Sequence, residues 1–182
     1  MYEQVAYVDQ QVYLFQDSLR FNITLGADYS DEEVMAAVKA CKLEDLVESL
    51  PCGLDSLIEE NGKNLSGGQR QRIAIARALI KKPRILILDD CLSAVDALTE
   101  ASIRDSLAAE AHERGLLIVS QKISSIIDCD RIVVLDDGEA AGVGTHQELL
   151  ESCQVYRDIY QSQYGKEALD EFMTGKEAAI HG

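Results

Sequence analysis

Two short apolar runs, at residues 85–88 and 116–119, constrain the fold of this 182-residue chain more than any other feature. Neither run alternates apolar with polar residues, so each is typical of a strand buried on both faces of a parallel sheet. A helical pattern over residues 97–114 lies between them and ends at Gly115. Strands that alternate with helices in this way predict an α/β fold with a mostly parallel sheet.

The remaining elements follow from local signals. Residues 4–8 alternate as a strand. Residues 31–50 have apolar residues at helical spacing, and Ser30 and Glu33 form the pattern of a capping box. A helix is expected over residues 69–80 and a helical turn over 124–127. Strands are expected at 131–135 and 139–143, joined by a hairpin turn, with helix from residue 145 onward. We find no repeat and no linker, which favours one domain.

Composition excludes several classes of protein. The chain has 32 acidic and 17 basic residues, a net charge of −15. A chain this acidic is a poor non-specific binder of nucleic acid or of anionic lipid, so no nucleic-acid partner is expected. No apolar run approaches the ~18–20 residues that cross a bilayer, so direct membrane insertion is not expected either. Five scattered cysteines without Cys-x-x-Cys spacing argue against a zinc ribbon.

Against this background, residues 63–84 contain seven bases and no acid. Such a run is often only the solvated face of a helix. Within it, however, Ser66, Gly67, Gly68 and Gln69 stand at the start of the expected helix. Two glycines let the backbone come close to a phosphate, and the free amides, the helix dipole and the serine hydroxyl all favour an anion.

The string over residues 65–72 resembles the signature motif of the ABC ATPases. The resemblance implies that Ser66, Gly67, Gly68 and Gln69 contact ATP. It extends from about residue 3 to residue 163, which predicts the C-terminal part of a nucleotide-binding domain over residues 1–163 and a tail over 164–182.

Other motifs of that family follow in the same order. Gln10 resembles the glutamine of the Q-loop, and Asp89 the Walker B aspartate, which implies that both hold Mg²⁺. Asp96 ends a stretch similar to the D-loop, which crosses to a partner subunit. Residues 14–23 resemble the segment that faces the membrane domain in exporters, and residues 59–62 resemble the exporter X-loop.

Three departures from the family pattern change the expected function. The sequence has no Gly-x-x-x-x-Gly-Lys-Ser/Thr motif, so the fold is expected to lack the strand and helix of the phosphate loop. Asp90 stands where the family has a catalytic glutamate, and Gln121 stands where it has the switch histidine. Glutamine can hydrogen-bond a phosphate, but it cannot carry charge or pass on a proton.

Asp90 and Gln121 together resemble the degenerate half of a heterodimeric exporter, whose intact signature completes the partner's ATP site. This implies a second nucleotide-binding domain and a transmembrane domain as partners, at the cytoplasmic face of a membrane. Two alternatives stay open: an inactive truncated remnant, and a soluble ABC ATPase of DNA repair or chromosome structure. The acidity and the short spacing between Gln10 and the signature disfavour the latter.

Overall fold

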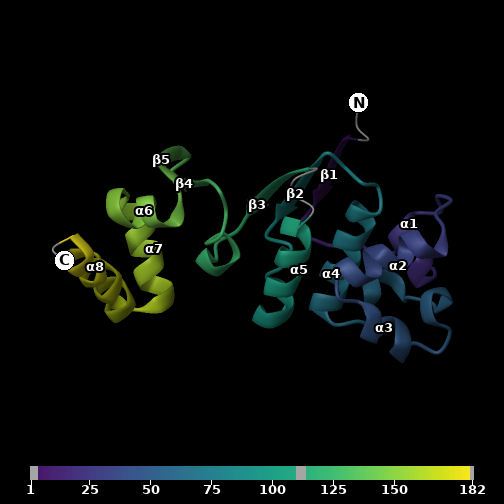
Figure 1. The fold of residues 1–182 in the computed structure, drawn as a ribbon. Coiled ribbons are helices and arrows are strands. Elements are labelled where there is room, and N and C mark those ends of the chain that lie inside the picture. The colour runs from purple at the N-terminus through teal and green to yellow at the C-terminus, as the bar shows by residue number, and fades with distance from the viewer. Residues whose placement is uncertain (1–3, 110–113, 181–182) are drawn as a thin grey trace. The chain divides into compact units, whose positions relative to one another are not determined.

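The computed structural model describes residues 4–109 and 114–180, which form two compact units divided after Val119 (Figure 1). The first unit contains three strands, five α-helices and two short 3₁₀ turns among its described residues. In chain order they are β1 (Val5–Val8), α1 (Leu19–Thr24), α2 (Asp31–Ala40), α3 (Glu44–Ser49), η2 (Gly53–Asp55), η3 (Glu60–Gly62), α4 (Gly67–Leu79), β2 (Ile85–Asp89), α5 (Ala97–Ala109) and β3 (Gly115–Val119).

The three strands form a parallel sheet in the order β1-β2-β3. Val5 pairs with Ile85 in β2, and Ile85 pairs with Gly115 in β3, so the strands begin nearly level. Their carboxyl ends therefore meet at one edge, where the residues after β1 and β2 that resemble family motifs also lie. The α/β fold class with a parallel sheet is confirmed.

One face of this sheet is buried and the other is exposed. Ala6, Val8, Leu86 and Leu88 are buried in the core of the unit. On the opposite face five large apolar side chains are between 45% and 54% exposed: Val5, Tyr7, Ile85, Leu117 and Val119. In this unit the apolar strands are therefore buried on one face and exposed on the other, as expected for a fold that lacks the helix of the phosphate loop.

Helix α4 is the central helix of the first unit and contacts β1, α1 and α2 (Figure 1). Its buried side chains include Ile73, Ile75 and Leu79. It begins at Gly67, two residues earlier than expected, because Ser66 caps it in a reciprocal capping box with Gln69. Because these side chains are packed in the core, they hold the signature residues at the start of the helix in place.

The helix expected over residues 31–50 is two helices, α2 and α3. The capping box of Ser30 and Glu33 is confirmed. The chain leaves α2 after Cys41 because Lys42 adopts a left-handed conformation with φ of 53°, and the amide of Leu43 then donates to the carbonyl of Val38. This helix end normally uses glycine, so the lysine gave no signal. The expected helix over 97–114 is α5 as far as Ala109, and the expectation for residues 110–113 lies outside the described residues.

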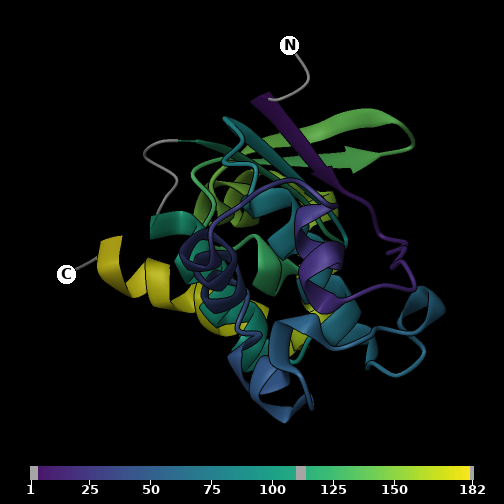
Figure 2. The ribbon, with the colours of Figure 1, turned by 90° about the vertical axis from the view of Figure 1, so that its right-hand side faces the viewer.

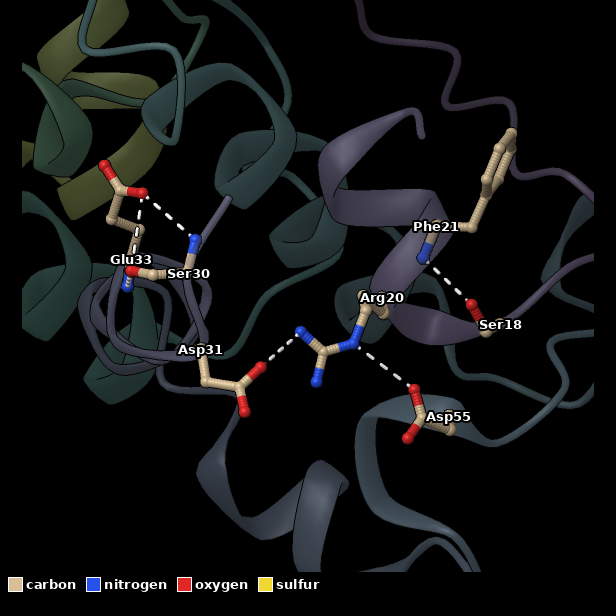
Figure 3. A network of polar contacts seen from close by, with 7 residues as sticks. All are labelled: Ser18, Arg20, Phe21, Ser30, Asp31, Glu33 and Asp55. Atoms are coloured by element: carbon tan, nitrogen blue, oxygen red, sulfur yellow. Dashed lines mark hydrogen bonds and ion pairs between the residues drawn. The ribbon is translucent and has the colours of Figure 1, made fainter. Parts of the chain in front are cut away.

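Surface ion pairs join the small helices around α4. Arg20 of α1 lies 2.7 Å from a carboxylate oxygen of Asp31 in α2 and 3.3 Å from one of Asp55 in η2 (Figure 3). Ser18 caps α1 by accepting from the amide of Phe21. Exposed pairs of this kind contribute little each, but Arg20 connects three segments that are far apart in sequence.

The second unit is built on an antiparallel hairpin. Its elements are η4 (Ile123–Ser125), β4 (Ile132–Asp136), β5 (Glu139–Gly144), α6 (His146–Ser152), α7 (Gln154–Tyr164) and α8 (Lys166–Ile180). Figure 2 shows β4 and β5 side by side. Asp137 and Gly138 both have positive φ in the turn, as the hairpin signal predicts. The expected turn at 124–127 is η4, one residue earlier.

Within the part of the chain that the structure describes, we find no helix that combines the length and the apolar character of a membrane span.

The same leucine-to-alanine substitution should lower the free energy of unfolding by different amounts on the two faces of the sheet. Leu86→Ala removes a fully buried side chain and should lower the free energy of unfolding by about 2–5 kcal/mol. Leu117→Ala in the neighbouring strand, 53% exposed, should change it by about 0.5 kcal/mol. Urea unfolding of both variants checks this. Equal losses would show that the outer face is covered in solution.

Candidate functional site

The carboxyl ends of β1 and β2 bring together the residues that resemble the Q-loop and Walker B motifs. Gln10 Nε2 donates to Asp90 Oδ2 at 3.2 Å, although the two residues are 80 positions apart in sequence. Tyr7 Oη donates to Asp89 Oδ2 at 2.6 Å. These bonds follow from the register of β1 against β2, since Tyr7 lies opposite Ile87, two residues before Asp89. One oxygen of each carboxylate is thereby engaged.

Asp90 is held in an unusual backbone conformation. Its φ is 45°, in the left-handed region that aspartate tolerates better than most residues. Its amide donates to the carbonyl of Val119 at 2.8 Å, which extends the contact between β2 and β3 by one residue. The direction of the Asp90 side chain is therefore fixed by the backbone as well as by Gln10.

Tyr7 is a residue of this site that sequence reasoning missed. The hydrogen bond to Asp89, with smaller contributions from desolvation and from nearby charges, raises the pKa of Tyr7 to about 12. Its place in an alternating strand gave the only available signal. The phenol therefore stays protonated at neutral pH and remains a donor to Asp89.

The signature residues form the first turn of α4. Ser66 Oγ accepts from the amide of Gln69, and Gln69 Oε1 accepts from the amide of Ser66 at 2.8 Å. Ser66 is exposed, and its hydroxyl proton and the side-chain amide of Gln69 remain able to donate. With the amides of Gly67 and Gly68, this turn is suited to a phosphate oxygen.

The stretch that resembles the D-loop, residues 93–96, leads into α5. Asp96 Oδ1 accepts from the amide of Thr99 at 3.0 Å, and this bond lowers the pKa of Asp96. Cys91, two residues before Ser93, is buried. Burial, followed by the nearby carboxylates, raises its pKa to about 12, so it is a thiol at neutral pH and has no character of a nucleophile.

Arg77, in the last turn of α4, anchors the segment after the Q-loop. Its guanidinium donates to the carbonyls of Asn22 at 2.7 Å and Tyr13 at 3.0 Å. The buried Asn22 in turn donates to the carbonyl of Phe15 at 2.9 Å. The basic run seen in the sequence thus includes a structural arginine, half-buried against backbone carbonyls.

Gln121 belongs to the second unit. Its carbonyl accepts from Gln163 Nε2 at 2.7 Å, and Gln163 Oε1 accepts from the amide of Ile123 at 2.9 Å. The switch segment is thus tied to α7, while the Gln121 side chain is exposed. No pattern in the sequence indicates that Gln163 supports this segment.

The donor set at the carboxyl ends of β1 and β2 fits Mg²⁺. The second oxygen of Asp89 and the side-chain oxygen of Gln10 make no hydrogen bond to a described residue that would prevent coordination. Both are hard oxygen donors, and Mg²⁺ commonly takes only one or two protein ligands beside phosphate and water. Among the described residues, no three His, Cys, Asp or Glu side chains cluster as a metal site by themselves, so phosphate oxygens would have to complete the coordination.

The sequence comparison agrees with this geometry. The model of the ABC transporter family matches residues 1–93, which include the segment after β1, the signature turn and Asp89 and Asp90. The chain belongs to the ABC transporter family. The segment after β1, the signature turn and the stretch that resembles Walker B therefore lie within the matched segment, whereas Asp96 and Gln121 lie beyond it.

Similar proteins are ATP-binding proteins and exporters. The uncharacterized ABC transporter ATP-binding protein YfiB of Bacillus subtilis is 44% identical over 90% of this chain. The ATP-dependent lipid A-core flippase of Haemophilus influenzae is 43% identical over 89% of it. The chain spans 28% of the length of each. The structure of a bacterial Atm1-family ABC exporter with ATP bound matches 89% of the chain and 29% of its own, with a TM-score of 0.85 and 39% identity.

The Tyr7–Asp89 bond predicts a pH dependence. In the Mg²⁺-free chain Tyr7 should titrate near pH 12 and, in Asp89→Asn, close to the ordinary tyrosine value of 10. Because the folded pKa is raised, the stabilising effect of the bond is fully present below pH 10 and is lost as the pH rises toward 12. NMR of ring-labelled tyrosine measures this.

Tyr7→Phe is the control for that titration, since Tyr156 also has a raised pKa, because of burial. The signal missing from Tyr7→Phe belongs to Tyr7. A Tyr7 signal that titrates at pH 10 in the unaltered chain would contradict the hydrogen bond.

Proposed function

We propose that this chain is the ATP-binding part of an exporter-type ABC transporter and that its intact signature turn completes the ATP site of a partner subunit. The observation that carries the proposal is the first turn of α4, where Ser66, Gly67, Gly68 and Gln69 are ordered by a capping box and keep their donors available. The exporter relatives support the class of protein. ATP bound there would face the amides and dipole of α4.

The chain's own Walker B side is proposed to be weak. The Asp90 side chain is one methylene shorter than glutamate, which withdraws the carboxylate by roughly an ångström, and a displacement of that size can cost about 10²-fold in rate. Its Oδ2 already accepts from Gln10. Gln121, at the switch position, cannot relay a proton.

Within that site Gln10 and Asp89 are proposed to hold Mg²⁺, which neutralises the charge of the phosphates when it is bound. Tyr7 keeps one oxygen of Asp89 engaged and so leaves the other to face the metal. Asp96 is proposed to contact the nucleotide held across the subunit interface.

The proposed partners are a transmembrane exporter domain and a second, catalytically competent nucleotide-binding domain, at the cytoplasmic face of the membrane. Residues 1–163 would act as the nucleotide-binding portion and 164–182 as a tail. The alternative is that the chain is an inactive remnant. The departures from the family pattern at Asp90 and Gln121 are compatible with that hypothesis too. A role in DNA repair is less well supported, since the chain carries a net charge of −15.

A chimeric exporter tests the proposal. Residues 4–165 of this chain replace the matching segment in one subunit of the Atm1-family exporter, and the second subunit, with a different tag, stays unaltered. The mixed pair should hydrolyse ATP. Ser66→Arg in the chimeric subunit should lower that rate about 10²-fold. The arginine side chain is much larger than that of serine and blocks the turn that faces the partner's phosphate.

Asp90→Asn in the same subunit is the matched control and should change the rate by about twofold, because that position is already impaired. The proposal is wrong if Asp90→Asn is more damaging than Ser66→Arg. A mixed pair without any ATPase activity would favour the inactive remnant.

A further inference from the structure

Ala94, an exposed residue within the D-loop stretch, lies against the start of α4. Its amide donates to Gln71 Oε1 at 3.0 Å. A Cβ atom on Gly67 would lie 3.3 Å from the Cβ of Ala94, and one on Gly68 would lie 2.9 Å from its carbonyl oxygen. The two glycines therefore have a packing role of their own: they let the signature turn and the D-loop touch.

Both polar atoms of the Gln71 side chain form hydrogen bonds with the same loop. In addition to accepting from Ala94, its Nε2 donates to Ser93 Oγ at 3.3 Å. The residue is only 8% exposed and lies on α4, two residues after Gln69. A buried amide is costly unless its polar atoms are paired, so this position stabilises the fold only while the loop stays in place.

The loop has few other backbone bonds of its own. The amide of Ser93 donates to the carbonyl of Asp90 at 3.4 Å, which is long, and the amide of Val95 donates to Leu92 at 3.0 Å. The bond from Ala94 to Gln71 is thus the shortest link between this loop and α4 that the described hydrogen bonds contain. Through Ser93 and Asp90 it also reaches the chain's own Walker B end.

We propose that Gln71 is a positioning residue that locks the D-loop against the signature turn, so that Ser66 and Asp96 are presented to the partner's ATP site as one rigid surface. This inference rests on the proposed function for its role, but the lock itself is a property of this chain alone. Gln71 acts through Ala94 and does not touch the nucleotide.

Amide hydrogen exchange, measured by NMR on the 182-residue chain, tests the hydrogen bond between Ala94 and Gln71 without ATP. In Gln71→Leu the amide of Ala94 should exchange at least about fivefold faster, because its acceptor is gone. The amides of Ile75 and Ala76 inside α4 should stay within about twofold, which separates loss of the lock from loss of the fold. Gln71→Glu keeps an acceptor oxygen and should preserve most of the protection.

Gln147→Leu, an exposed substitution of the same type on α6, is the matched control and should leave Ala94 unchanged. Unchanged exchange of Ala94 in Gln71→Leu overturns the proposal. If that variant fails to fold, the unaltered chain decides: exchange of Ala94 at the rate of an unstructured peptide would also overturn it.

The chimeric pair described above tests the consequence for the partner's site. Gln71→Leu in the chimeric subunit should lower kcat about tenfold with KM within about twofold, and Gln71→Glu should restore at least half of the rate. Faster exchange at Ala94 without any change in kcat would refute the positioning role. If the unaltered pair is inactive, the proposed function fails, while the exchange result still decides whether Gln71 locks the loop.

Discussion

Helix α4 is held by polar contacts to both loops that carry the candidate site, and the rest of the first unit is arranged around it. Near its start, Gln71 binds the backbone at Ala94. In its last turn, Arg77 binds the carbonyls of Tyr13 and Asn22 in the segment that follows Gln10. Its apolar side chains fill the core between β1 and the pair α1 and α2. A displacement of α4 along its axis would therefore alter its hydrogen bonds to both loops.

The sheet supplies the second constraint, because it sets the distance between the Q-loop glutamine and the Walker B end. Parallel pairing of β1 with β2 brings Gln10 to Asp90 and Tyr7 to Asp89. The left-handed backbone at Asp90 then turns the chain from β2 toward the D-loop. Strain of this kind persists where the surroundings fix it, here through the bond to Val119 and the contact with Gln10.

Much of the fold could be predicted from the sequence because its signals are local. The capping box at Ser30, the glycine start of α4 and the Asp137-Gly138 turn each depend on neighbouring residues only. The break at Lys42 could not be predicted, since a lysine in the left-handed region has no distinctive pattern. Burial of one sheet face alone depends on which helices pack there, and periodicity within a strand does not record that.

The residues of the candidate site also divide into those that the sequence indicates and those that only the structure reveals. Gln10, Ser66 and Asp89 could be proposed from the sequence because the strings around them resemble the motifs of a known family. Tyr7 and Gln71 could not, because their roles come from partners more than twenty positions away. Each is an ordinary residue of a strand or helix until the tertiary contact is formed. Long-range hydrogen bonds to conspicuous motifs are therefore the features that the structure adds.

The central claim is that the signature turn of this chain receives the phosphate of ATP held by another subunit. The most direct measurement is NMR of the 182-residue chain mixed with the separate nucleotide-binding domain of the Atm1-family exporter, with and without Mg-ATP. The account predicts that the amide signals of Gly67 and Gly68 shift only when ATP is present, while that of Gly138 in the hairpin turn of the second unit does not. Signature amides that stay unmoved, or that shift equally without ATP, would contradict it.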